Sequence, residues 1–196
     1  MDVPVPAWPG RPQLRMGVEL TVPRGAPPTP GGFVIRQFVP GDEQTWSDLL
    51  RWTIGPSWTP ERLRRDVLSD EAAIIHIATT TDDHRAVVGS ACLQITGSRP
   101  RLGAYLSLVA VRTSARGYGL GRALVETALK TAERCGATHM LLDTEDHRVT
   151  AIGLYLDVGF LPSITDPSHP ERWHALSREL RPATRALLVG TLATED

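Results

Sequence analysis

The residues best suited to chemistry lie in a glycine-rich turn between an apolar segment and a predicted helix. Residues 106–122 read LSLVAVRTSARGYGLGR. Glycine has no Cβ, so the backbone amides of such a turn can approach a ligand closely, and the N-terminus of the following helix adds partial positive charge. Arg112, Arg116 and Arg122 add positive potential nearby. This pattern predicts an anion-binding loop, and the ligand that we expect on it is a diphosphate.

Two other kinds of phosphate loop fit these residues less well. A dinucleotide-binding fingerprint follows the first strand of its fold and is completed by an acidic residue about 20 positions later. Here the glycines follow roughly the fourth predicted strand, after an antiparallel meander. A Walker loop requires Gly-Lys-Ser or Gly-Lys-Thr, and residues 116–122 contain neither. We therefore set both of these interpretations aside.

The elements around the loop alternate in type. From residue 33 onward, the hydrophobic periodicity and the turn residues predict a strand, two helices, three strands, a helix, a strand and a short helix. The expected strands are 33–38, 72–80, 86–95, 104–111, 138–142 and 160–164, and the expected helices are 42–52, 59–68, 120–135 and 150–156. Residues 173–180 are compatible with a strand or a helix. A strand–helix–strand crossover implies at least one parallel pair, so we expect a mixed α/β sheet.

Two sequence blocks in this order resemble the GNAT superfamily of acyl-CoA-dependent N-acyltransferases. The pyrophosphate loop of that family has the form Gln/Arg-x-x-Gly-x-Gly/Ala, and Arg116, Gly119 and Gly121 occupy its fixed positions. Residues 151–160, AIGLYLDVGF, match a later helix of the family with its Ala-Ile-x-Leu-Tyr and Gly-Phe. The resemblance spans about residues 33–180. It implies the GNAT fold, in which helices flank a mixed central sheet with a V-shaped splay.

The resemblance also implies acetyl-CoA as cofactor and an assignment of its binding residues. The strand at 109–111 is expected to splay from a parallel neighbour near Thr144, so that its free main-chain groups hold the pantetheine arm and polarise the thioester carbonyl. The acceptor amine then attacks directly, and no covalent enzyme intermediate is needed. The implied cofactor-binding residues are Val109, Ala110, Val111, Arg116, Gly117, Tyr118, Gly119, Leu120, Gly121, Arg122, Arg148 and Tyr155.

Tyr155 stands where the family often keeps a general acid. A phenol near the sulfur can protonate the leaving thiolate. The alternative is that Tyr155 only packs against the cofactor arm. Seven residues earlier the family often has Asn, and this chain has Arg148. Arginine has donors but no acceptor, so a contact that needs a side-chain carbonyl is lost, and Arg148 is expected instead near a phosphate or an acidic substrate.

The acceptor side is less defined by the sequence. The predicted acceptor residues are Trp52, Trp58, Tyr105 and Glu145, because the resemblance implies an acceptor pocket beside the first two helices and beside the strand ends. Trp46 belongs to the same aromatic group, and the alternative for these tryptophans is that they fill the core. The candidates for the general base are Asp143, Glu145, Asp146, His147, Tyr105 and Ser107, and the sequence does not decide among them. The alternative for each is a solvated loop residue without a catalytic role. The segment 169–174 either borders the acceptor or is a turn with Trp173 as a plug.

Composition excludes several other classes of protein. The 196 residues carry 21 Lys+Arg and 22 Asp+Glu, a net charge of −1, and this balance argues against binding to duplex nucleic acid. No run approaches the roughly 20 apolar residues that cross a bilayer, and the N-terminus lacks the apolar core of a secretory signal. Cys92 and Cys135 have no metal-ligand spacing, so we expect buried thiols, no metal and a reducing cytoplasm.

Proline is concentrated at the N-terminus, where eight of the 16 lie within the first 30 residues. We therefore expect an extended leader at 1–31, a transferase domain at 32–181 and a tail at 182–196. Alternation of apolar residues at 14–22 favours a short strand that docks, either on this domain or on a second copy in a homodimer.

Taken together, these features predict an N-acetyltransferase that moves an acetyl group from acetyl-CoA to a primary amine of a small molecule. The alternatives are a GNAT-fold enzyme with another acyl donor or other thioester chemistry, and a module that senses acyl-CoA without catalysis. Protein N-termini and lysines are further possible acceptors.

Overall fold

The computed structural model describes residues 12–21, 24–25, 27–98 and 101–192. The chain divides into two compact units, and each is described separately. The central unit comprises residues 20–138, and the terminal unit combines residues 1–19 with 139–196. Among the described residues, no helix is both long and apolar enough to cross a membrane.

The central unit contains an antiparallel sheet in the order β2–β3–β4–β5. Its strands are β2 (Phe33–Gln37), β3 (Ala73–Thr80), β4 (Val87–Ser98) and β5 (Arg101–Val111). Its helices are α1 (Glu43–Thr53), α2 (Pro60–Asp66) and α3 (Leu120–Arg134), and a short 3₁₀ helix, η1 (Thr113–Ala115), precedes α3. The predicted strands and helices of this region are confirmed. The helix expected from residue 59 begins with a side-chain cap, because the Arg62 amide donates to Thr59 Oγ1 at 3.2 Å.

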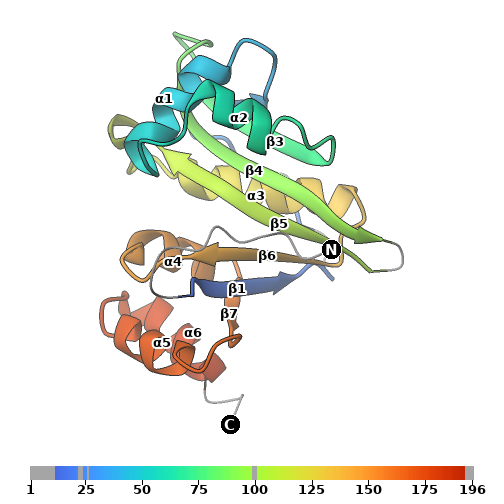
Figure 1. The fold of residues 1–196 in the computed structure, drawn as a ribbon. Coiled ribbons are helices and arrows are strands. Elements are labelled where there is room, and N and C mark those ends of the chain that lie inside the picture. The colour runs from blue at the N-terminus through green and yellow to red at the C-terminus, as the bar shows by residue number, and fades with distance from the viewer. Residues whose placement is uncertain (1–11, 22–23, 26, 99–100, 193–196) are drawn as a thin grey trace. The chain divides into compact units, whose positions relative to one another are not determined.

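Helices cover both faces of this sheet (Figure 1). On one face Ile75 and Ile77 of β3 pack in a buried cluster with Trp46 and Leu50 of α1 and with α2. The alternating residue His76 faces α3 instead, where its Nε2 lies 3.1 Å from Thr131 Oγ1. This two-sided burial explains why β3 reads as a nearly continuous apolar run.

The terminal unit contains a second antiparallel arrangement, in the order β6–β1–β7. These strands are β1 (Leu14–Glu19), β6 (His139–Thr144) and β7 (Leu161–Ser163), and the helices are α4 (Val149–Asp157), α5 (His169–Ser177) and α6 (Pro182–Leu192). The strand predicted within the leader is confirmed as β1. For residues 173–180 the helical alternative holds, because α5 places Trp173 in the core. The prolines of the leader before residue 12 lie outside the described residues.

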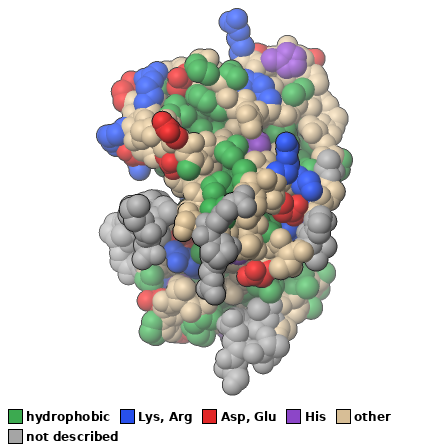
Figure 2. Space-filling view, turned by 90° about the vertical axis from the view of Figure 1, so that its right-hand side faces the viewer, with side chains coloured by type: hydrophobic (Ala, Val, Ile, Leu, Met, Phe, Trp, Pro, Cys, Tyr) green, Lys and Arg blue, Asp and Glu red, His purple; other side chains and the backbone are tan. Residues whose placement is uncertain are grey.

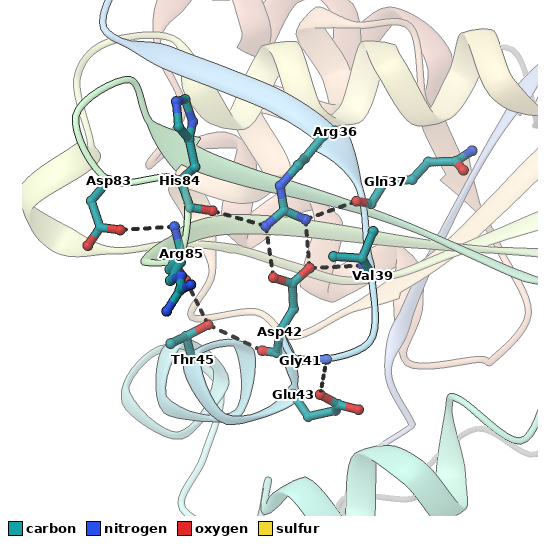
Figure 3. Close-up of polar contacts among 10 residues, drawn as sticks. All are labelled: Arg36, Gln37, Val39, Gly41, Asp42, Glu43, Thr45, Asp83, His84 and Arg85. Carbon is teal, nitrogen blue, oxygen red and sulfur yellow. Dashed lines mark hydrogen bonds and ion pairs between the residues drawn. The ribbon is translucent and has the colours of Figure 1, made fainter.

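Asp42 stands where the sequence expects a helix to begin, and an aspartate there is expected to cap the helix with its side chain. The structure of the corner between β2 and α1 shows that this expectation is wrong. Asp42 precedes α1, but its carboxylate does not cap the helix. It accepts two hydrogen bonds from the Arg36 guanidinium, at 2.6 and 2.8 Å, and one from the Val39 amide at 2.9 Å (Figure 3). Arg36 also donates to the His84 carbonyl at 3.1 Å, so one guanidinium ties the corner to the β3–β4 turn. The Asp42 carboxylate therefore makes its hydrogen bonds to the Arg36 guanidinium and not to the first amides of α1, because charge-assisted bidentate bonds are stronger.

We predict that Asp42→Asn destabilises the protein at pH 7 by about 2 kcal/mol, because it leaves a largely buried guanidinium without its charged partner. Burial raises the pKa of Asp42, but the Arg36 hydrogen bonds and the Val39 amide outweigh it and hold the pKa below its ordinary value. The stabilisation is therefore complete above the unfolded pKa of about 3.9 and is lost as the pH falls through the folded value.

Urea unfolding at pH 7 and pH 3 measures this effect. The gap between wild type and Asp42→Asn should be large at pH 7 and should narrow at pH 3. The exposed Asp82→Asn serves as the matched control and should change neither curve. Equal stability of wild type and Asp42→Asn at pH 7 would contradict the assignment.

Candidate functional site

The glycine-rich loop leads from β5 through η1 into α3. Gly117 and Gly119 both have positive φ, at 86° and 81°, a conformation that glycine adopts without strain. A Cβ added to either residue would meet no atom within 4 Å, so this side of the loop faces open space. No side chain caps the N-terminus of α3 at Gly119. The predicted loop geometry is present.

The backbone amides of the loop are available to a ligand. Within the described part of the chain, those of residues 117–121 donate to no protein acceptor. They lie at the start of a 15-residue helix, where the helix dipole favours negative charge. Unpartnered amides that surround open space fit the oxygens of a diphosphate. The donors are therefore suitable for a diphosphate, and the ligand of this loop stays a prediction.

The side chains of the loop lie in different environments, some buried and some exposed. Leu120 is buried and anchors α3 in the core, so only its main chain can serve a ligand. The Tyr118 ring is 62% exposed and packs on Phe33, with the ring centroids 5.6 Å apart. Arg116 Nε donates to the Val111 carbonyl at 3.1 Å, and Arg122 forms an ion pair with Glu126 at 3.4 Å. Both arginines therefore stay beside the loop with part of their donor capacity in use.

A bulge in β5, which the sequence did not indicate, lies directly before Val109. Ser90 pairs with Ala110 and Cys92 pairs with Ser107, so β5 has one residue more than β4 in this interval. Leu108 has a φ of +50°, the only positive value of a non-glycine residue in the described chain. The Ser90 hydroxyl donates to the Leu108 carbonyl at 2.8 Å. Bulges change the direction of backbone groups and are frequent beside functional sites. The bulge at Leu108 is therefore compatible with the expectation that the main chain of 109–111 binds the pantetheine arm.

In the terminal unit, Tyr155 lies on α4 and is 8% exposed. Its ring meets Phe160 edge-on, with the centroids 5.9 Å apart. Burial raises the pKa of Tyr155 to about 12; Arg148 lowers it and Glu145 raises it. Its hydroxyl has no protein partner among the described residues. The phenol therefore keeps its proton throughout the neutral range and has it available to donate.

The charged residues around the end of β6 are paired with one another. Arg148 and Glu145 form an ion pair, and Glu145 also accepts from Gln13 Nε2 at 3.0 Å. Asp146 accepts three hydrogen bonds from Arg172, at 2.9 to 3.1 Å. The sequence did not predict these partners.

Asp143 has an arginine partner as well. It accepts from Arg15 at 2.9 and 3.0 Å, across the register that pairs β1 with β6. Its bidentate pairing occupies lone pairs that a general base would use. The expected solvated loop position holds for His147, which is exposed.

The tryptophans separate into different environments. Trp46 is completely buried in the core, so the core alternative holds for it. Trp52 is 89% exposed on α1. Trp58 is partly buried, and the Arg62 guanidinium lies 4.3 Å from its ring centroid. Tyr105 lies on β5 opposite Gln94. The three tryptophans therefore do not form one aromatic wall.

The cysteines and the metal-ligating residue types show no second centre. Cys92 is buried and free, and burial raises the pKa of its thiol to about 12, so it is not a nucleophile. Among the residues that the structure describes, no group of three or more His, Cys, Asp or Glu side chains has the arrangement of a metal site.

Comparison with known proteins identifies the class to which this fold and loop belong. The model of the acetyltransferase (GNAT) family matches residues 41–160, and the chain belongs to this family. The α/β GNAT fold expected from the sequence is thereby confirmed. Acetyltransferases of this family use acetyl-CoA as the acetyl donor.

Two curated relatives and one solved structure are similar to this chain. A mycothiol acetyltransferase of Thermobispora bispora is 31% identical over 74% of this chain and 52% of its own length, and one of Salinispora arenicola is 30% identical over 76% and 50%. The chain thus spans about half the length of these curated relatives. A GCN5-related N-acetyltransferase of Sphaerobacter thermophilus has a similar structure, with a TM-score of 0.59 and 30% identity over 78% of this chain and 50% of that one.

Proposed function

We propose that this chain transfers an acetyl group from acetyl-CoA to a primary amine of a small-molecule acceptor. The observation that carries the proposal is the loop at 117–121, in which open glycines and unpartnered amides lie at a helix N-terminus. That arrangement suits the diphosphate of coenzyme A. Membership of the acetyltransferase (GNAT) family supports the reaction type.

Two stretches of main chain bind the donor in this proposal. The main chain of Val109, Ala110 and Val111, next to the bulge at Leu108, binds the pantetheine arm. The positive charge of Arg116 lies beside the diphosphate, whose oxygens accept from the backbone amides of Gly117, Tyr118, Gly119, Leu120, Gly121 and Arg122. Bound acetyl-CoA supplies an activated thioester, so the chain needs no nucleophilic side chain. Its task is to hold two reactants in line, which lowers the entropic part of the barrier.

Tyr155 acts as the general acid. Its hydroxyl holds a proton at neutral pH, as any tyrosine does, and burial raises its pKa further, to about 12. When the amine nitrogen bonds to the acetyl carbon, the carbon–sulfur bond breaks and the leaving thiolate accepts the proton of the phenol. The proton that the amine nitrogen loses passes to solvent, from which the phenolate is protonated again. Arg148 contributes through its charge, which lowers the pKa of Tyr155 and so makes this proton transfer easier.

The acceptor is a small amine held near Trp52, Trp58, Tyr105 and Glu145. The mycothiol acetyltransferases among the relatives support a small-molecule acceptor. A second candidate is the amine of a polypeptide N-terminus, because residues of this chain are 34% identical over 61 positions to the N-alpha-acetyltransferase 30 of Saccharomyces cerevisiae. The two free cysteines suit the reducing cytoplasm, which is the compartment we propose.

Release of free thiol from acetyl-CoA tests the proposal. The protein is incubated with acetyl-CoA and a panel of small amines, amino sugars and short peptides, and product masses are recorded. We expect amine-dependent thiol release and a mass gain of one acetyl group on a small amine. The same amines, acetylated beforehand, provide the control. Acetylation of peptides alone would favour the second candidate, and tight coenzyme A binding without any transfer would favour a sensing module.

A further inference from the structure

A cavity of about 580 Å³ lies in the central unit, away from the glycine-rich loop. It is bounded by the residues after β2, the start of α1, the end of α2 and the start of β3. The first residue of β3, Ala73, lines it, whereas the last, Thr80, pairs with Phe33, whose ring contacts Tyr118 of the loop. Seven residues of strand span about 23 Å, so the cavity and the loop lie at opposite ends of β3. None of the residues proposed to bind the diphosphate lines this cavity, so the acetyl-CoA site does not account for it.

The cavity has an apolar floor beside polar lining of similar extent. Phe38 and Leu68 are partly buried and pack against the core cluster, and Ile75 belongs to that cluster. On the face drawn in Figure 2, hydrophobic side chains lie at the surface among acidic and basic ones, although that view labels none of the residues that line this cavity. A floor of this kind favours hydrocarbon, because water that contacts Phe38 and Leu68 would be released when a ligand covers them. The volume is in the range of pockets that take small molecules.

Two carboxylates and one guanidinium line the rim of the cavity, and they differ in their hydrogen-bond partners and exposure. Asp70 is partly buried and is held by the Ala72 amide and by Gln94 Nε2, both at 2.9 Å. Glu43 accepts from the Gly41 amide at 2.7 Å. Neither carboxylate has a cationic partner among the described residues. The one lining arginine, Arg64, has a side chain that is 57% exposed and lies 4.0 Å from Glu61.

We propose that this cavity binds an amphiphilic primary amine. Its ammonium group would lie between the carboxylates of Asp70 and Glu43, and its hydrocarbon would cover Phe38, Leu68 and Ile75. The two carboxylates are fixed by hydrogen bonds to neutral donors, which orient them without neutralising them. Arg64 is turned to solvent and to Glu61, so the rim retains a net negative charge toward a ligand. This inference is independent of acetyl transfer, because none of these residues belongs to the proposed acetyl-CoA site.

Calorimetric titration with octylamine, octanoate and butylamine, in the absence of acetyl-CoA, tests the inference. We expect saturable one-to-one binding of octylamine at pH 7 and at least tenfold weaker binding of octanoate. Each buried methylene group contributes about fourfold in affinity, so butylamine should also bind at least tenfold more weakly.

Two isosteric variants on different elements check the rim. Asp70→Asn and Glu43→Gln should each weaken octylamine binding about tenfold, with unchanged circular dichroism. Asp82→Asn, in the turn at the other end of β3, should leave the affinity unchanged. The inference is overturned if octanoate binds as tightly as octylamine, or if neither rim variant changes the affinity for octylamine.

Discussion

We expect Gly119→Asp to weaken the binding of coenzyme A by about a thousandfold. The backbone of Gly119 has a φ of +81°, and its missing side chain points to open space at the start of α3. An aspartate there would place a carboxylate against the incoming diphosphate. Like charges about 4 Å apart repel by roughly 4 kcal/mol near a protein surface, which is about a thousandfold in Kd. Calorimetric titration with coenzyme A measures the loss.

Two variants separate charge from backbone strain. Gly119→Ala adds only the strain of a positive φ, about 1 kcal/mol, and should keep most of the affinity. Gly41→Asp makes the same chemical change at another glycine with positive φ and open space, away from the loop, and should bind coenzyme A like the wild type. Retention of normal affinity by Gly119→Asp would remove the diphosphate from this loop.

The second large effect is expected from Tyr155→Phe. Loss of the hydroxyl should lower kcat for acetyl transfer about a hundredfold, the usual contribution of a general acid. The Kd for coenzyme A should stay within about twofold, because the ring and its contact with Phe160 are kept. Steady-state kinetics with the best amine of the panel, together with calorimetric titration of coenzyme A, separates the two quantities.

The pH profile gives an independent check of Tyr155. Because its pKa is about 12, the wild-type rate should show no loss from ionisation of this phenol below about pH 11. An unchanged kcat in Tyr155→Phe would mean that the ring only packs. A fall in coenzyme A affinity equal to the fall in kcat would place the hydroxyl in binding and not in proton transfer.

Local patterns were sufficient to predict most of the central unit. Gly117 and Gly119 have positive φ, which glycine adopts without strain, so a turn at these positions could be predicted from the sequence. The Thr59-Pro60-Glu61 start of α2 is likewise local, and its cap forms as expected. Tyr155 was singled out by the resemblance of residues 151–160 to the GNAT family, but its raised pKa depends on burial, which only the folded chain supplies.

Features that depend on partners distant in sequence could not be predicted. The pairing of Arg15 with Asp143 joins residues 128 positions apart, and that of Arg172 with Asp146 follows from the packing of α5. The bulge at Leu108 arises where β4 and β5 differ by one residue in register, and neither strand carries a glycine or proline there to indicate it. Asp42 has the residue type and position of a helix cap, and nothing in the local sequence indicates that its carboxylate pairs with Arg36 instead.

The position of β1 has a consequence for how this chain is made. Leu14 and Met16 of β1 are completely buried between β6 and β7, which belong to residues more than a hundred positions later. During synthesis β1 has no strand partner until residues 139–163 have left the ribosome, and pairing over such a separation is slow. A recombinant fragment cut to the boundaries of the family match, 41–160, would lack both β1 and β7 and would leave the edge of β6 that pairs with β1 open to aggregation. Expression trials are therefore best designed from a start before residue 12.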